Sequence, residues 1–202
     1  ILLGTGLLWF GWFGFNAGSA LAADGVATTA FVNTNIASAT AMLTWLLGDG
    51  ALGKKRSAVG AAVGAVVGLV AITPAAGFVT VGQSIFIGFV AAMVSYTAVR
   101  YKSKSNIDDT LDVFSCHGLG GIVGMILTGV FAKNVGLTSG ETHTFLFHLL
   151  ALVLVSLFTF GGSYLLYKIT DMILPMRVTP EQEEKGLDLT QHGEEAFDFR
   201  TK

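Results

Sequence analysis

An aromatic cluster with one hydroxyl stands in the first uncharged stretch of the sequence, in GWFGFNAGS from Gly11 to Ser19. Trp12, Phe15 and Ser19 are spaced by three and four residues, so a helix places them on one face. Aromatic rings attract cations by roughly 0.5–2 kcal/mol, and a hydroxyl oxygen accepts a hydrogen bond from an N–H donor. The cluster predicts a shallow vestibule for a small ammonium-like cation, with ordinary aromatic packing as the equal alternative.

A histidine stands inside another uncharged run, at His117 in DDTLDVFSCHGLGG. An ionisable residue within a membrane span is a functional hypothesis by default. A neutral imidazole offers one donor and one acceptor, so it lines a path for a small polar molecule without burying a charge. The alternative is a structural histidine bonded to a neighbouring helix. Four glycines allow another helix to approach closely: Gly118, Gly120, Gly121 and Gly124.

The neighbouring polar residues have plainer interpretations. Acidic residues at the start of the same helix cap free N–H groups and suit the positive end of the helix dipole; they are Asp108, Asp109 and Asp112. Cys116 is expected to be a small buried thiol. His148 lies among apolar residues and is expected to pack or face lipid, while no pore role is assigned to His143 or His192.

The elements that must position these residues are membrane helices. The chain has 202 residues, of which 52% are hydrophobic and 13% charged, about half the charged share of a soluble domain. This composition predicts an all-α polytopic membrane protein. The single cysteine excludes an internal disulfide framework. No basic patch indicates nucleic acid, and no metal-ligand cluster or nucleophile–base pair indicates a cofactor or an enzyme.

Charged residues and the turn at Thr73–Gly77 divide the chain into six predicted spans and a tail. The spans are about 1–21, 27–47, 57–73, 80–100, 113–132 and 144–174, giving a transmembrane domain over 1–176 and a polar tail over 177–202. Because Ile1 is neither Met nor part of a basic n-region, we expect preceding sequence.

The loop charges predict the orientation of the spans. Basic residues follow the second, fourth and sixth spans, at Lys54, Lys55, Arg56, Arg100, Lys102, Lys104 and Arg177, whereas the alternate loops hold only Lys133. Basic loops are usually cytoplasmic. The first helix is therefore expected to run outward, with Ser19 near the outside and the tail in the cytoplasm. Three glycines predict a close packing face on the third helix: Gly60, Gly64 and Gly68.

Long motifs in this chain resemble ammonium transporters of the Amt/Mep/Rh superfamily, in the Amt/Mep branch. WFGWFGFNAGSA and AFVNTN are similar to their sixth and seventh spans, DDTLDVFSCHGLGGIVGMILTGVFA to their tenth, and EEKGLDLTQHGE to their tail. The resemblance implies eleven spans, built as two inverted five-helix repeats and a final long helix, in homotrimers with one pore per subunit. This chain then corresponds to spans six to eleven.

The resemblance also implies roles for individual residues. Ser19 matches the serine of an outer ammonium site, Phe15 one of two stacked gate phenylalanines, and Trp12 a pore-lining tryptophan. His117 matches the second of two paired pore histidines, and Thr73 is a candidate for the outer mouth. The first histidine, the other gate phenylalanine and the outer-site tryptophan belong to the half of the family fold that this sequence lacks.

The expected function is transport of ammonium or ammonia, with methylammonium as an analogue, through a protein embedded in the lipid bilayer of the cell membrane. The tail is expected to be regulatory and, as in prokaryotic relatives, to lie where a P-II signalling protein docks. Thr190 is either a phosphorylation or docking point or, more simply, a capping residue. The alternative function is a membrane ammonium sensor of the same fold, which a fused signalling domain would favour.

Overall fold

The computed structural model describes residues 1–194, and within them all regular structure is helical. Residues 195–202 of the predicted tail lie outside the described residues. The chain forms two compact units, Ile1–Val153 and Leu154–Lys202. The helical elements are α1 Leu2–Gly18, α2 Gly25–Ala51, α3 Ala58–Ile72, α4 Val81–Lys102, the π-helical turn η1 Phe114–Gly118, α5 Leu119–Phe131, the 3-10 turn η2 Leu137–Ser139, α6 His143–Ile173, α7 Pro180–Lys185 and the π-helical turn η3 Asp188–His192.

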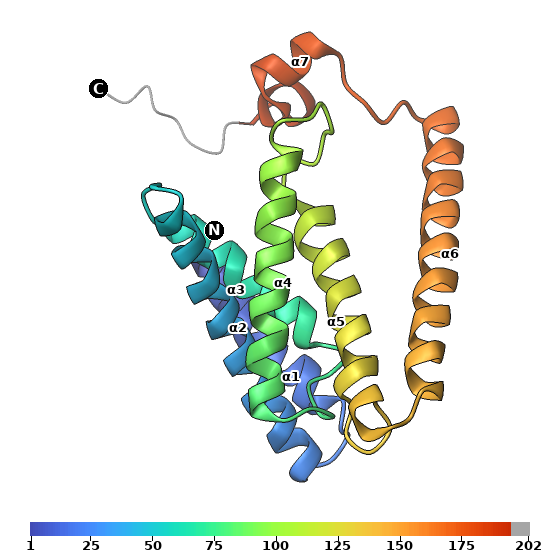
Figure 1. Ribbon diagram of the computed structural model, residues 1–202. Coiled ribbons are helices and arrows are strands. Elements are labelled where there is room, and N and C mark those ends of the chain that lie inside the picture. Colours follow the sequence, from blue (N-terminus) through green and yellow to red (C-terminus); the bar gives the residue numbers. More distant parts are fainter. Residues whose placement is uncertain (195–202) are drawn as a thin grey trace. The chain divides into compact units, whose positions relative to one another are not determined.

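Each of the six segments predicted as spans is helical over most of its length. Three helical segments are long and apolar enough to cross a membrane: Val81–Lys102, Phe114–Phe131 and His143–Ile173. The protein is therefore an all-α polytopic membrane protein, and the crossing of α1, α2 and α3 stays a prediction. In the first unit the loops after α2 and α4 lie at one end, and those after α1, α3 and α5 at the other (Figure 1). The basic loops thus share one end.

Side-chain caps fix where the helices of the first unit begin. The Asp24 carboxylate accepts two backbone N–H bonds at the start of α2, and the Ser57 hydroxyl accepts one at the start of α3. Thr80 and Gln83 form a reciprocal capping box at the start of α4. Each cap satisfies N–H groups that the helix itself leaves free. The turns between helices are therefore specified by local sequence.

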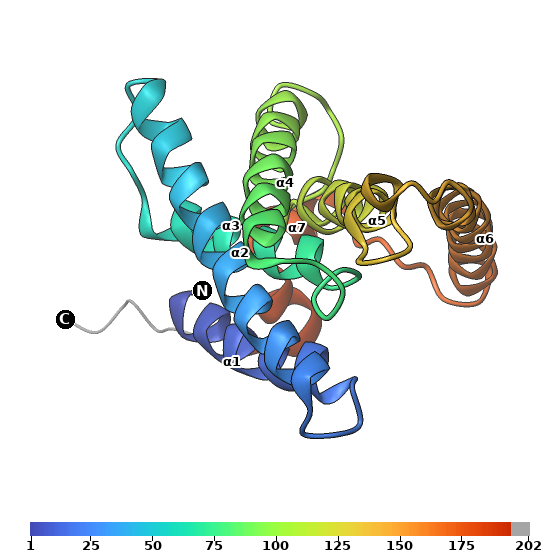
Figure 2. The ribbon, with the colours of Figure 1, turned by 60° about the horizontal axis from the view of Figure 1, so that its bottom comes forward.

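Helix α2 packs against α1, α3 and α4 (Figure 1, Figure 2), and glycines permit the close approach. Gly60, Gly64 and Gly68 of α3 face α2 at Trp45 and Ala37, so the predicted glycine face is confirmed as a packing face. A methyl group at Gly64 would lie 2.7 Å from Trp45 Cβ. The backbones therefore approach to a distance that no larger side chain permits.

The buried face of α2 also carries polar side chains, and two of them, Asn33 and Ser38, donate hydrogen bonds to backbone carbonyl groups. Asn33 is fully buried, and its Nδ2 donates to Ala76 O and Val79 O, both at 2.8 Å. The Ser38 hydroxyl donates to Ala65 O on α3 at 2.8 Å. Because the carbonyl groups of the turn between α3 and α4 have no helical partners, Asn33 supplies the donors that this turn lacks. The turn carrying Thr73 is thereby fixed to α2.

Gly88 of α4 and Gly68 of α3 both meet the Ala37 backbone of α2. We expect Gly88→Ala to force these helices apart and to lower the free energy of unfolding by about 1–3 kcal/mol. Gly82→Ala on the same helix is the matched control, since no atom lies within 4 Å of its added methyl group. Thermal unfolding of the full-length protein in detergent measures both, and equal stability of the two variants contradicts the packing interpretation.

Candidate functional site

A direct hydrogen bond joins two of the predicted site residues. Trp12 of α1 donates its indole Nε1–H to Thr73 Oγ1 at the end of α3, at 2.8 Å. The Thr73 hydroxyl in turn donates to Leu69 O at 2.8 Å, so both its donor and an acceptor position are occupied. The Trp12 and Phe15 rings contact edge to face, with centroids 6.1 Å apart. Residues 61 positions apart in sequence are thus held together.

Ser19 stands at the end of α1, beside the same residues. Its hydroxyl donates to Phe15 O at 2.6 Å, which leaves the lone pairs of Oγ free to accept from an N–H donor. Phe15, Ser19 and Thr73 line one pocket of about 200 Å³. The other lining residues are Asn16, Ala20, Val26, Ala30, Ala76, Gly77 and Phe78. The pocket is mainly apolar, with hydroxyl groups and one amide in its wall.

Trp12 lies outside this pocket, in a second and more open groove along α1. The groove is lined by Gly4, Leu7, Leu8, Gly11, Trp12 and Phe15 and has a volume of about 620 Å³. Phe15 is therefore the residue shared by groove and pocket, and it is 64% exposed. A ring in this position separates the two spaces. The gate role of Phe15 stays a prediction.

Asn16, the amide within the aromatic cluster, joins α1 to α2. Its Nδ2 donates to Thr34 Oγ1 of α2 at 2.9 Å, and both side chains are buried. The Thr34 hydroxyl donates onward to Ala30 O at 2.6 Å. Buried polar groups bond in this way because water is absent from the interior. Sequence reasoning missed Asn16 and Asn33 as positioning residues; the signal was an amide in each uncharged run.

His117 lies in the π-helical turn η1 rather than in a regular helix, and it is exposed. Within residues 1–194 its ring nitrogens have no hydrogen-bond partner, and no ring contact joins it to Trp12 or Phe15. Helix α3 approaches the glycines that follow His117, since Gly124 of α5 meets the backbone of Ala71 of α3. The structure therefore assembles four of the five predicted residues and leaves His117 on an open surface. π-Helical turns occur often at functional sites.

An ion pair fixes the turn that carries His117. Lys102 Nζ lies 2.6 Å from Asp112 Oδ1 and donates to Asp109 O at 2.6 Å. The Asp109 carboxylate accepts from the N–H groups of Val113 and Phe114 at 2.8 and 3.0 Å. The capping interpretation is therefore confirmed for Asp109. For Asp112, whose φ is +55°, the sequence did not reveal the ion pair with Lys102.

The family of the chain follows from comparison with known proteins. A sequence model of the Ammonium Transporter Family matches residues 1–197. The chain belongs to the ammonium transporter family. The ammonium transporter of Bacillus subtilis is 46% identical over 203 residues, covering 96% of this chain and 50% of that protein. The chain thus spans about half the length of the curated relatives it matches.

Solved structures share the fold of this ammonium-transporter chain. Saccharomyces cerevisiae Mep2 matches with a TM-score of 0.85 and 34% identity, over 90% of this chain and 44% of that one. A structure described as a sensor Amt protein matches with a TM-score of 0.85 and 31% identity, over 94% of this chain and 48% of that one. The fold of the matched part of the chain is therefore shared with family members of both descriptions.

His148 and the tail of this ammonium-transporter chain make local contacts. His148 Nδ1 lies 3.2 Å from Met125 O of α5, which agrees with the packing interpretation.

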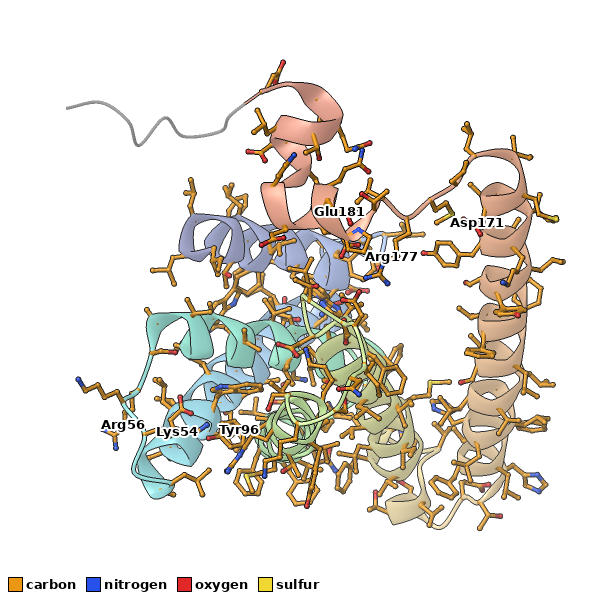
Figure 3. The ribbon with its side chains drawn as sticks, turned by 90° about the horizontal axis from the view of Figure 1, so that it is seen from above. Lys54, Arg56, Tyr96, Asp171, Arg177 and Glu181 are labelled. Atoms are coloured by element: carbon orange, nitrogen blue, oxygen red, sulfur yellow. The ribbon has the colours of Figure 1, made fainter. Side chains whose placement is uncertain are left out.

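In the second unit, Arg177 Nε lies 3.0 Å from Glu183 Oε1, and Arg177 and Glu181 are labelled in Figure 3. Thr190, partly buried, donates its hydroxyl to Gly186 O at 2.8 Å. This bond favours the capping interpretation of Thr190.

The start of α7 is stabilised by its charges as well as by a capping box between Thr179 and Gln182. The pKa of the Glu181 carboxyl is held below its ordinary value, first by the backbone N–H of Glu181 and then by the Thr179 side chain. A carboxylate in the first turn also suits the positive end of the helix dipole. The contribution of Glu181 to the turn is therefore present at neutral pH and lost as pH falls through the lowered pKa.

The bond between Trp12 and Thr73 is testable by removing its acceptor. Thr73→Val keeps the shape of the side chain but leaves the indole N–H unsatisfied, whereas Thr73→Ser keeps the hydroxyl as a control. We expect Thr73→Val to lower the free energy of unfolding of the full-length protein by about 1–3 kcal/mol and to shift the indole N–H resonance of Trp12. Unfolding and resonance equal to those of Thr73→Ser show that the bond contributes nothing.

Proposed function

We propose that the complete protein conducts ammonium, in the form of ammonia, across a cell membrane. The observation that carries the proposal is the pocket shared by Phe15, Ser19 and Thr73, with Trp12 bonded to Thr73, in a chain of the ammonium transporter family. Ser19 offers free lone pairs to an N–H donor, and the neighbouring rings offer π faces to a cation. In the predicted orientation this pocket opens to the outside, where ammonium is captured.

The cost of burying a charge requires that ammonium loses its proton before it crosses the membrane. Moving a bare ammonium ion into a low-dielectric interior has an idealised cost of order 20 kcal/mol, whereas a cation–π contact returns only about 2 kcal/mol. The pocket therefore recruits the ion but does not carry it through. We infer that ammonium is deprotonated near the Phe15 gate and that ammonia passes the His117 imidazole. Potassium has no proton to give up and is rejected.

His117 needs a partner from outside this chain. Its ring is exposed here, without a hydrogen bond in the described part of the molecule, and the resemblance implies a second pore histidine in the preceding half. Two imidazoles in contact share one proton and alternate as donor and acceptor. A path lined by such a pair accepts ammonia without a full buried charge.

The rest of the proposal concerns the assembly. By resemblance, the complete protein forms homotrimers in the cell membrane, its tail lies in the cytoplasm, and a P-II signalling protein binds that face. The relatives that support transport are named as ammonium transporters, and we assign no enzymatic activity. The ion-paired start of the tail and the internally bonded Thr190 support a folded regulatory segment rather than an irregular one.

The second candidate function is an ammonium sensor. It is favoured by the structural match to a protein described as a sensor Amt protein. A sensor uses the same outer pocket to bind ammonium, but the bound state is relayed through the tail instead of releasing ammonia on the other side. The two functions therefore differ in flux and not in the requirement for Ser19.

Flux measurements separate these functions. We expect the full-length protein in liposomes to show saturable methylammonium and ammonium uptake. Ser19→Leu fills the pocket and should raise the half-saturating concentration about tenfold or more, a loss of about 1.4 kcal/mol of binding. His117→Ala should alter the flux or the preference for ammonium over potassium. Uptake is measured by stopped-flow pH change and by labelled methylammonium.

The controls are Ser139→Leu and His143→Ala, which make the same changes at exposed positions outside the pocket. Unchanged ammonium-over-potassium preference in His117→Ala would falsify the proposed role of that histidine. Absence of flux, together with tight ammonium binding that needs Ser19, identifies the protein as a sensor.

Deleting Glu181–Lys202 tests the regulatory role of the tail. The deletion removes the capping box and the Arg177–Glu183 ion pair while leaving the pocket residues in place. We expect the response of transport to P-II binding to change, with ammonium selectivity retained. Flux and P-II binding are measured on the same preparation, and if the deletion leaves both intact the tail has no regulatory function.

A further inference from the structure

The ion pair between Lys102 and Asp112 spans the segment that joins α4 to the turn carrying His117. Lys102 is the last residue of α4, and the chain passes from there through residues 103–113 to η1 and α5 (Figure 1). Lys102 Nζ lies 2.6 Å from Asp112 Oδ1 and donates to Asp109 O at 2.6 Å. The Asp112 N–H also donates to Asp109 O, at 3.0 Å. One ammonium group therefore holds both ends of the turn 109–112.

The ion pair also holds Asp112 in an uncommon backbone conformation. The φ of Asp112 is +55°, in the left-handed region that disfavours most residues other than glycine, asparagine and aspartate. Its carboxylate oxygen Oδ1 is buried, and in the part of the chain that the structure describes the Lys102 ammonium is the group that meets its charge. A buried carboxylate that loses its partner is strongly destabilised. Lys102 therefore favours the backbone geometry that directs the chain into η1.

Hydrogen bonds continue from Asp112 into the turn that holds the imidazole. Asp112 O accepts from the N–H of Cys116 at 2.9 Å, and the Asp109 carboxylate accepts from the N–H of Phe114 at 3.0 Å. His117 follows Cys116 directly and lies within η1. The contacts thus lead from the Lys102 ammonium to the residue before the imidazole. A shift of the turn 109–112 is therefore transmitted to His117.

The two supports of η1 differ in kind. On the α5 side the support is close backbone packing, since Gly124 meets the backbone of Ala71 of α3. On the α4 side the support is the side chain of Lys102. Backbone packing leaves little freedom of adjustment, whereas the position of the ammonium depends on one side chain. The direction of the imidazole is therefore sensitive to residue 102.

We propose that Lys102 and Asp112 are positioning residues for the His117 imidazole, and that their ion pair sets the rate at which ammonia passes it. The inference rests on the proposed role of His117 in conduction. Neither residue lines the pocket that contains Ser19, so the pair acts on passage and not on capture. The competing interpretation is a clamp that stabilises the fold and has no effect on conduction.

Ammonium uptake by the full-length protein in liposomes tests the proposal with Lys102→Gln and Asp112→Asn. Asparagine tolerates the left-handed backbone, so Asp112→Asn removes the charge alone. We expect each variant to lower the maximal flux about tenfold, because a small misplacement of a positioned group costs up to about 10²-fold. The half-saturating concentration should not change. Lys102→Arg should restore the flux, and Lys104→Gln is the matched control, since it removes the same charge from an exposed lysine.

Combination with His117→Ala separates a positioning role from a clamp. If Lys102 acts through the imidazole, Lys102→Gln lowers the flux of the protein that contains His117 and has no further effect in His117→Ala. The ¹⁵N resonances of the His117 ring should also shift in Lys102→Gln and return in Lys102→Arg. An equal loss of flux in both backgrounds overturns the positioning role. So does a lowered thermal stability of Lys102→Gln with flux equal to that of Lys104→Gln.

Failure of the proposed conduction through His117 gives a different result. If His117→Ala alone leaves flux and selectivity unchanged, that histidine has no part in conduction. The ring resonances then decide the positioning role, which a shift supports and an unchanged spectrum overturns. If His117→Ala alters flux while Lys102→Gln changes neither the flux nor the resonances, the role of His117 stands and the positioning role is wrong.

Discussion

Polar groups inside a membrane protein must find partners within the protein, and the first unit depends on how Asn33 meets this constraint. Its amide N–H groups bond the carbonyls of Ala76 and Val79, where the chain leaves the helical pattern between α3 and α4. Asn33, Ala76 and Val79 are all buried, so solvent does not replace these bonds. The turn is thereby held against α2, and Thr73 at its start is held where Trp12 reaches it. A single buried amide thus links three helices to the candidate site.

Backbone proximity is the second requirement, and the glycines provide it. Apolar side chains gain little from leaving lipid for protein, so membrane helices associate through close packing and buried hydrogen bonds. Gly68 and Gly88 bring α3 and α4 onto one residue of α2, Ala37, and Gly124 brings α5 onto α3. The bonds of Asn33 and Ser38 join α2 to α3 and to the turn that follows it, and the bond of Asn16 joins α1 to α2. Close packing and buried hydrogen bonds therefore act together between α2 and α3.

The sequence predicts the helices well because local signals define them. Uncharged runs, the turn at Thr73–Gly77 and the glycine spacing of the third helix all correspond to what the structure contains. The bonds between distant residues were not predictable: Trp12 with Thr73 and Lys102 with Asp112 depend on how helices meet in space. The family motifs named four residues that the structure assembles. His117 has no hydrogen-bond partner among the described residues, and its proposed partner histidine belongs to the half of the relatives that this chain does not span.

The π-helical turn before α5 has a mechanical consequence. A π turn contains one residue more than the α-helical turn it replaces, which rotates everything after it by about 100° relative to everything before it. The acidic cap and the ion pair with Lys102 lie before the turn, and the glycine surface that meets α3 lies after it. The His117 imidazole lies within the turn, so its direction depends on both the capped segment before the turn and helix α5 after it. A one-residue deletion between Phe114 and Gly118 would return the segment to regular helix and rotate the two sides by about 100° relative to each other, so that the acidic cap and the glycine surface would not both keep their present contacts.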